Sequence, residues 1–175
     1  TQYTKKELEP FLLSIKKAAT VYTVGAGTAS FAAGQIAFFL RKYANIKAVE
    51  LKSYEVESYK DLFSKDDVLL AISQSGETAD TIEAIEYAKK KGTKIASLVN
   101  MLGSTTTRIS DFTFFSRSGP EVCVASTKAF TTQVAWGFLV TMALIGKYDE
   151  AKDVISTLST KLEGYFSPEL FTQIK

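Results

Sequence analysis

Short apolar runs alternate along the chain with longer segments of helical periodicity. The β-prone runs occupy positions 21–24, 48–51, 68–72, 95–99 and 112–115. The third run, Val-Leu-Leu-Ala-Ile, contains no polar residue, which is typical of a central parallel strand covered on both faces. Apolar residues with helical spacing predict helices over residues 4–19, 28–43, 78–91, 126–146 and 149–165.

This alternation predicts an α/β fold. We expect a three-layer α-β-α sandwich of the flavodoxin-like or Rossmann-like kind, with roughly five parallel strands. A length of 175 residues fits one domain. In such sheets ligands bind beyond the carboxyl ends of the strands, where the strand order switches. Function is therefore expected in the loops that follow Val24, Ile72 and Phe115.

The composition excludes several classes of function. The net charge is +2 and the basic residues are spread along the sequence, which argues against nucleic-acid binding. The longest apolar stretch, residues 134–145, is too short to span a bilayer, so no membrane partner is expected. The sequence has no histidine, which excludes Ser-His-Asp catalysis and histidine-ligated metal sites within this chain. We expect neither a metal nor a cofactor.

The single cysteine, Cys123, allows no disulfide within the chain. This fits a reducing compartment, and we expect a cytoplasmic protein. No base partner for Cys123 is evident, so it is expected to be a small buried hydrophobe rather than a nucleophile. The chain begins with Thr1, and helices are predicted at both ends, so we expect a segment of a longer protein.

The strongest site candidate is the segment that follows the apolar run at 68–72. It reads Ser-Gln-Ser-Gly-Glu-Thr over residues 73–78 and leads into a predicted helix. The first turn of a helix presents free N–H groups and positive partial charge. Gly76 permits a tight turn and removes a Cβ that would keep a ligand away. Three hydroxyls and an amide without a cation suit a phosphate monoester held by neutral donors. The alternative is a simple helix cap, with Ser75 at the N-cap and Thr78 in the first turn.

A second strand-to-helix loop, Val-Gly-Ala-Gly-Thr-Ala-Ser over residues 24–30, half matches a dinucleotide fingerprint. Glu50, near the end of the next strand, would be the ribose-binding acid of such a site. However, Ser30 stands where the third small residue belongs, and the segment at 73–78 has no role in that scheme. A tight turn that needs glycine explains the loop as well.

The third loop, residues 118–128, leads from the last predicted strand into the long apolar helix. Ser126, Thr127 and Lys128 are positioned to face a ligand. A capped helix start in which Lys128 pairs with Glu121 explains the same residues equally well.

Three motifs, in their order along the sequence, resemble those of the sugar isomerase (SIS) family. They are Gly27-Thr28, then residues 73–78 continuing to Asp80-Thr81, and then Val-Ala-Ser-Thr-Lys-Ala-Phe-Thr-Thr-Gln over residues 124–133. The third motif is similar to a segment in the isomerase half of the glutamine–fructose-6-phosphate aminotransferases. The resemblance covers roughly residues 20–147, and residues 1–175 are expected to form one SIS domain with flanking helices.

The resemblance implies a set of ligand contacts. Four residues would bind the phosphate of a phosphosugar: Ser73, Gln74, Ser75 and Thr78. Thr28 and the Val124 backbone would touch the sugar. The family usually has a serine after the first-loop threonine, where this chain has Ala29, and Ser30 is the candidate to replace it. The remaining candidates are Gly76, Glu121, Ser126 and Lys128.

The resemblance also implies that the chemistry lies elsewhere in a parent chain. In the family, a Schiff-base lysine, a proton-shuttling glutamate and a ring-opening histidine belong to a second SIS domain, and a glutaminase domain carries a cysteine nucleophile. This chain would therefore bind fructose 6-phosphate or glucosamine 6-phosphate for hexosamine biosynthesis and would dimerise through its SIS helices. The alternatives are a phosphosugar-sensing regulatory domain and the SIS domain of another amino-sugar-phosphate isomerase or deglycase.

Overall fold

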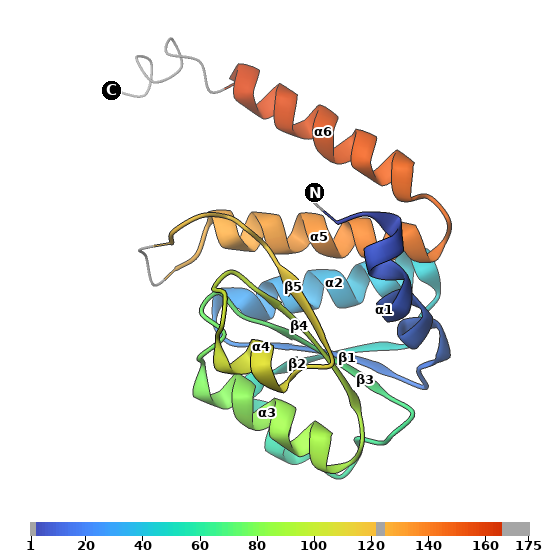
Figure 1. Ribbon diagram of the computed structural model, residues 1–175, viewed down its shortest axis with the longest axis vertical. Coiled ribbons are helices and arrows are strands. Elements are labelled where there is room, and N and C mark those ends of the chain that lie inside the picture. The colour runs from blue at the N-terminus through green and yellow to red at the C-terminus, as the bar shows by residue number, and fades with distance from the viewer. Residues whose placement is uncertain (1–2, 122–124, 166–175) are drawn as a thin grey trace.

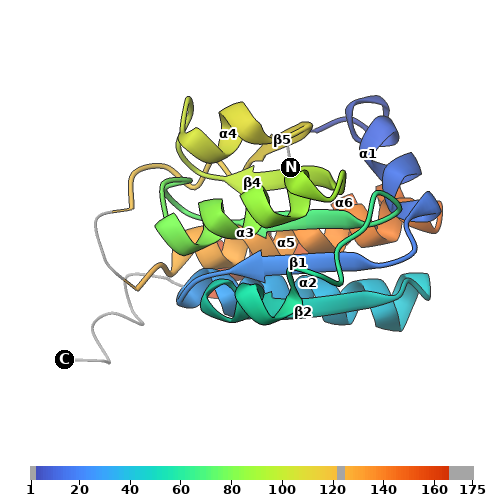
Figure 2. The ribbon, with the colours of Figure 1, turned by 90° about the horizontal axis from the view of Figure 1, so that it is seen from below.

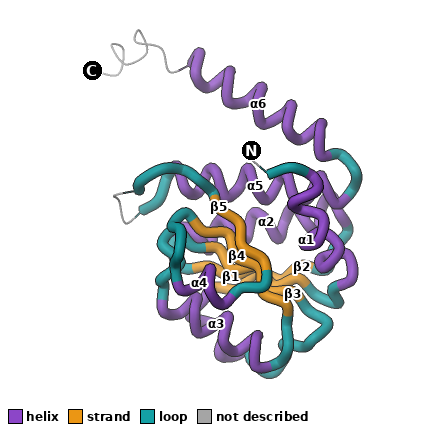
Figure 3. The backbone as a smooth tube through the Cα atoms, in the orientation of Figure 1, coloured by secondary structure: helices purple, strands orange, loops and turns teal. Residues whose placement is uncertain are grey.

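The computed structural model describes residues 3–121 and 125–165. Five strands form one sheet: β1 (Val21–Gly25), β2 (Ala48–Lys52), β3 (Val68–Ile72), β4 (Lys94–Val99) and β5 (Phe112–Phe115). All neighbouring strands are parallel, in the order β2-β1-β3-β4-β5 (Figures 1 and 3). The sequence prediction of a parallel sheet with five strands is confirmed.

Helices cover both faces of this sheet. They are α1 (Lys5–Lys17), α2 (Thr28–Ala44), the 3-10 helix η1 (Ser53–Tyr59), α3 (Ala79–Lys90), α4 (Thr105–Ile109), α5 (Lys128–Leu144) and α6 (Tyr148–Tyr165). Helices α1, α2 and α5 lie on one face, and η1, α3 and α4 lie on the other (Figures 1 and 2). Helix α6 packs on α5, outside the first layer. The predicted three-layer sandwich is confirmed.

The central strand β3 explains why both faces need a helical layer. Its five residues are all buried. Val68, Leu70 and Ile72 join the core under α1, α2 and α5. Leu69 and Ala71 point the other way and pack with the residues of α3 and η1. This follows from the alternation of side chains along a strand.

The chain changes face between β1 and β3. From β1 it runs through α2 on one face to the edge strand β2, whereas from β3 it runs through α3 on the opposite face to β4. The loops after β1 and β3 therefore diverge and leave a crevice at the carboxyl ends of these two strands. This is the position where open α/β sheets bind ligands.

Two short helices, η1 and α4, are not among the predicted elements. The sequence pattern predicts no element between the runs at 95–99 and 112–115, yet residues 105–109 form α4. Seven and five residues are too few for a clear periodic apolar pattern, so such elements escape recognition by spacing.

Helix α5 is apolar almost all round because one side packs on the sheet and α2 and the other packs on α6. Within residues 3–121 and 125–165, no helix combines the length and apolarity that crossing a membrane would require. Gly137 on α5 lets this helix approach α2 closely, because a Cβ there would collide with Ile36 and would lie 2.9 Å from its Cδ1.

We predict that Gly137→Ala lowers the free energy of unfolding by about 1–3 kcal/mol, since overpacking forces two buried helices apart. The matched control is Gly164→Ala in α6, where an added Cβ meets nothing within 4 Å. That change should alter the free energy of unfolding by no more than about 0.5 kcal/mol, because Gly164 lies in the exposed last turn of α6. Urea unfolding of both variants is the measurement. Equal effects at the two positions would contradict the close α2–α5 approach.

Candidate functional site

A cavity of about 310 Å³ lies at the carboxyl ends of β1 and β3. It is lined by Ala26, Gly27, Thr28, Ala29, Ile72, Ser73, Gln74, Ser75, Thr78 and Ser126. The structure therefore brings together all three segments that the sequence singled out, although they are separated by up to about a hundred residues. No lysine or arginine is among these lining residues, so the donors that face the cavity are neutral.

Two helices begin at this cavity without a side-chain cap. Gly27 is the N-cap of α2 and Thr78 is the N-cap of α3, and neither residue makes a capping hydrogen bond through a side chain. The first N–H groups of a helix have no partner within the helix and carry positive partial charge. The N–H groups of Ala29, Ser30 and Thr81 already donate to nearby carbonyls, so an anion in the cavity would accept from the other N–H groups of these first turns. The expected alternative, a cap of α3 formed by Ser75, is not what the structure contains.

The hydroxyls of the 73–78 loop are arranged as acceptors toward their own backbone. Gly76 N–H donates to Ser73 Oγ at 2.9 Å, and Glu77 N–H donates to Ser75 Oγ at 3.1 Å. Each hydroxyl keeps its own proton for a further bond. The loop is thus held in shape by the lone pairs of its serines, while their O–H groups are available as donors to an anion.

Residues far along the chain hold the back of this loop. Thr106 of α4 donates to the Gly76 carbonyl twice, from its N–H at 3.1 Å and from its Oγ1 at 2.7 Å. Gln133 of α5 donates from Nε2 to the Ser73 carbonyl at 3.3 Å. Sequence reasoning did not assign either role. For Gln133, the available signal was a lone amide within an apolar helix; its side chain is only 1% exposed.

Glu77 points away from the cavity and joins the loop to α4. The Thr105 N–H donates to Glu77 Oε1 at 2.7 Å. This hydrogen bond from the Thr105 backbone, with further help from the Thr105 side chain and the positive charge of Arg108, lowers the pKa of Glu77 below its usual value. Glu77 therefore remains ionised and accepts a hydrogen bond from the first residue of α4.

The remaining sequence candidates fall in different places. Ser30 is buried and donates to the Gly27 carbonyl at 2.7 Å, and it is not among the residues that line the cavity. Glu121 accepts from the Ala129 N–H at 3.0 Å and so caps α5. The ion pairs of the described residues do not include one between Glu121 and the exposed Lys128. Val124 and Cys123 lie outside the described residues.

Glu50, the residue that a ribose would need, packs against α2. Its carboxylate contacts Gly34 so closely that a Cβ added to Gly34 would lie only 2.7 Å from Glu50 Oε2. It pairs in register with Thr23, two residues before the end of β1. The described part of the chain also contains no group of three or more Asp, Glu, Cys or His side chains that could hold a metal ion.

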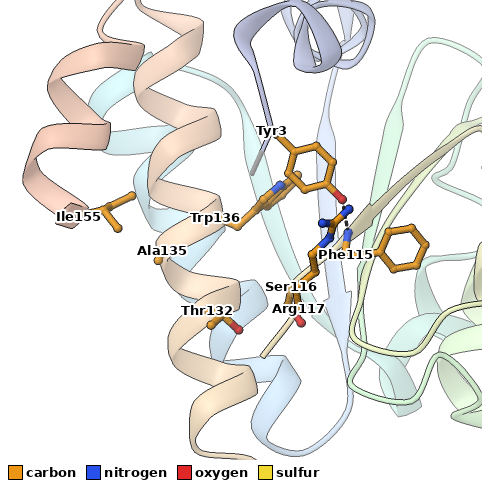
Figure 4. Close-up of a pocket in the computed structure, with 8 residues that line it drawn as sticks. All are labelled: Tyr3, Phe115, Ser116, Arg117, Thr132, Ala135, Trp136 and Ile155. Carbon is orange, nitrogen blue, oxygen red and sulfur yellow. Dashed lines mark hydrogen bonds between the residues drawn. The ribbon is translucent and has the colours of Figure 1, made fainter. Parts of the chain in front are cut away.

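A second cavity, of about 250 Å³, lies between β5, α5, α6 and the N-terminal segment (Figure 4). Tyr3, Phe115 and Trp136 form much of its wall. The Trp136 Nε1 is buried and has no hydrogen-bond partner among the described residues. This cavity lies at the sheet edge, away from the switch in strand order, so the cavity at β1 and β3 is the better candidate.

Known proteins resemble this chain in sequence and in fold. The SIS domain model matches residues 14–143. A glutamine–fructose-6-phosphate aminotransferase (isomerizing) from Pyrobaculum aerophilum is 44% identical over 128 residues, which are 73% of this chain and 21% of that protein. The chain thus spans about a fifth of the length of this relative.

Solved structures share the fold. The C-terminal domain of glucosamine-fructose-6-phosphate aminotransferase from Francisella tularensis superposes with a TM-score of 0.72 at 26% identity, over 87% of this chain and 46% of that chain. The Vibrio vulnificus NanR protein complexed with ManNAc-6P superposes with a TM-score of 0.70 at 19% identity, over 94% of this chain and 62% of that chain. At 19% identity, the second likeness concerns the fold alone.

We predict that Gly76→Ala is far more damaging than Gly103→Ala. Both glycines have positive φ, 68° and 71°, so alanine costs about 1–2 kcal/mol of backbone strain at each. Only at Gly76 would the new Cβ also collide with Ser104, with 2.7 Å to its Cβ; at Gly103 nothing lies within 4 Å. Urea unfolding should therefore separate the two variants by at least about 1 kcal/mol. Equal losses would mean that the 73–78 loop does not pack against Ser104.

Proposed function

Because the chain belongs to the SIS domain family, we propose that it is the phosphosugar-binding domain of a glutamine–fructose-6-phosphate aminotransferase. Its ligand is fructose 6-phosphate or glucosamine 6-phosphate, and its pathway is hexosamine biosynthesis in the cytoplasm. The observation that carries the proposal is the cavity at β1 and β3, where five hydroxyls and two uncapped helix starts meet without a cation.

The chemistry of the cavity fits a phosphate at its α3 end. Ser73, Ser75 and Thr78 offer hydroxyl donors there, and the start of α3 adds backbone N–H groups and the positive end of the helix dipole. Thr28 and Ser126 line the rest of the cavity and are placed to hydrogen-bond the hydroxyls of the sugar. Gln74 also lines the cavity and is proposed to bind the phosphate, and Gly76 permits the tight turn of the same loop.

In this proposal the chain binds and orients the substrate and leaves bond making to other parts of a parent protein. The lining residues contain neither a lysine for a Schiff base nor an acid for proton transfer. The contribution of this domain is the positioning part of catalysis, which converts a loosely bound sugar into one held in a fixed pose.

A second candidate is a phosphosugar-sensing domain. The observation behind it is the likeness in fold to the NanR protein complexed with ManNAc-6P. The 44% identity to an aminotransferase favours the first candidate. The parent protein discriminates between them: a glutaminase domain before this chain supports the aminotransferase, and a DNA-binding module before it supports the sensor.

We predict that millimolar fructose 6-phosphate or glucosamine 6-phosphate raises the melting temperature, because a ligand that binds only the folded state stabilises it. Combining Ser75→Ala with Thr78→Ala should abolish this shift. The control combines Ser58→Ala with Thr160→Ala, two exposed hydroxyls that bond only within their own helices. No shift for the unmodified chain, or an unchanged shift in the Ser75/Thr78 variant, would refute the site.

The proposal includes a homodimer formed through the outer face of α2 and α5. Phe31 and Phe38 are 68% and 44% exposed and lie seven residues apart on the same side of α2. Phe39 beside them contacts Phe138 of α5, with ring centroids 5.7 Å apart, so the aromatic surface continues from one helix to the next. Exposed aromatic patches of this kind mark interaction sites.

We predict that Phe31→Glu shifts the chain toward monomer, since it places a charge within the apolar face. The matched control is Tyr54→Glu on η1, which is 66% exposed but lies on the other side of the sheet. Sedimentation velocity over about 1–100 µM protein is the measurement, because dimers in this affinity range dissociate on dilution. A monomeric unmodified chain, or equal effects of both changes, would contradict this interface.

A further inference from the structure

Asn100, the first residue after β4, uses its whole side-chain amide on one distant segment. Its Oδ1 accepts from Ser116 Oγ at 3.1 Å, from Ser118 N–H at 2.9 Å and from Ser118 Oγ at 3.0 Å. Its Nδ2 donates to the Gly119 carbonyl at 2.8 Å. Four hydrogen bonds therefore hold residues 116–119 to a single side chain.

The backbone of the same residue touches the 73–78 loop. The Asn100 N–H donates to the Gln74 carbonyl at 3.0 Å. Because β4 lies between β3 and β5, the end of β4 is the point where the loop after β3 and the loop after β5 are both within reach. Asn100 thus connects the two loops, with its main chain on one and its side chain on the other.

The segment that Asn100 holds does not follow a relaxed backbone path. Arg117 has φ 51° and Gly119 has φ 74°, so left-handed residues stand on both sides of Ser118. A non-glycine residue in this region costs free energy and persists where its surroundings impose it. Figure 4 shows Ser116 and Arg117 beside α5, where this turn begins. The amide of Asn100 supplies the contacts that impose the turn.

The turn leads directly to the far end of the proposed ligand cavity. Glu121 follows it and caps α5 by accepting from the Ala129 N–H, and Ser126, between them, lines the cavity. The hydrogen bond between Glu121 and Ala129 thus joins the segment at 116–121 to the start of α5, and Ser126 lies two residues before that helix.

The geometry points to Asn100 as a positioning residue that sets the sugar end of the cavity relative to its phosphate end. This inference rests on the proposed phosphosugar function. Asn100 is not among the residues that line the cavity, so it acts through the segment at 116–121. Its side chain does not bond to the 73–78 loop, so its loss should weaken contacts to a sugar and spare contacts to phosphate.

The first test needs no ligand. Amide hydrogen exchange of Ser118, followed by NMR, should be at least about tenfold faster in Asn100→Ala, because the acceptor is gone. Asn100→Asp keeps an oxygen at Oδ1 and should keep most of the protection, although it loses the donor to Gly119. Ser58→Ala is the control. A Ser118 amide that stays protected in Asn100→Ala overturns the inference, whatever the chain binds.

The second test compares two ligands by titration calorimetry. In Asn100→Ala the Kd of fructose 6-phosphate should rise by about fivefold or more, while the Kd of inorganic phosphate should change by less than about twofold. Equal losses for both ligands, or no loss for either, overturn the positioning role. An unmodified chain that binds neither ligand overturns the proposed function instead, and the exchange experiment then decides whether Asn100 anchors the turn.

Discussion

The burial of β3 on both faces is the constraint from which the rest of the molecule follows. A strand with apolar side chains on both sides needs a helical layer on each. The chain meets this need by sending α2 to one face after β1 and α3 to the other face after β3. The crevice between β1 and β3 is the geometric result, so the cavity exists because the core is double-sided.

In the proposed function, the cavity would bind an anion without a charged side chain among its lining residues. Two helix starts and several hydroxyls supply partial charges and directed donors, which are fixed by the fold rather than by flexible side chains. The loop itself is held in place by hydrogen bonds from Thr106 and Gln133 and by the hydrogen bond that Glu77 accepts from Thr105. Such an arrangement favours a specific pose over strong long-range attraction, which agrees with the proposed role of orienting a substrate.

Local patterns were enough to predict most of the fold and the loops of the site. The five strands are short apolar runs, and a loop between a buried strand and a helix can be recognised from its own residues. The family resemblance then indicated what the loops hold. The supports of the loops were out of reach, because Thr106 and Gln133 act over 30 and 60 residues of separation. Asn100 was equally invisible, since nothing in its neighbourhood indicates four bonds to residues 116–119.

Ser30 shows that a hydroxyl at a neighbouring position does not replace a missing hydroxyl contact at Ala29. A hydroxyl next to Ala29 was the natural candidate to replace a missing contact, yet in the structure it turns back to the Gly27 carbonyl. One residue along a helix rotates a side chain by about 100°, so adjacent positions do not point the same way. At the start of α2, Thr28 is therefore the one hydroxyl that lines the cavity, and Ser126 supplies the other hydroxyl outside the 73–78 loop.

Helix α6 is held at one end. Of its 18 residues only Tyr148 and Ala151, both in its first turn, are buried, while Val154, Leu158 and Leu162 are 54%, 56% and 42% exposed. A helix of this length has little stability of its own in water. Its later turns are therefore expected to open and close without unfolding of the sheet, as a small cooperative unit of low local stability. Helical content and core stability are consequently separate quantities in this protein, and a loss of far-ultraviolet ellipticity would not by itself report on the state of the ligand cavity.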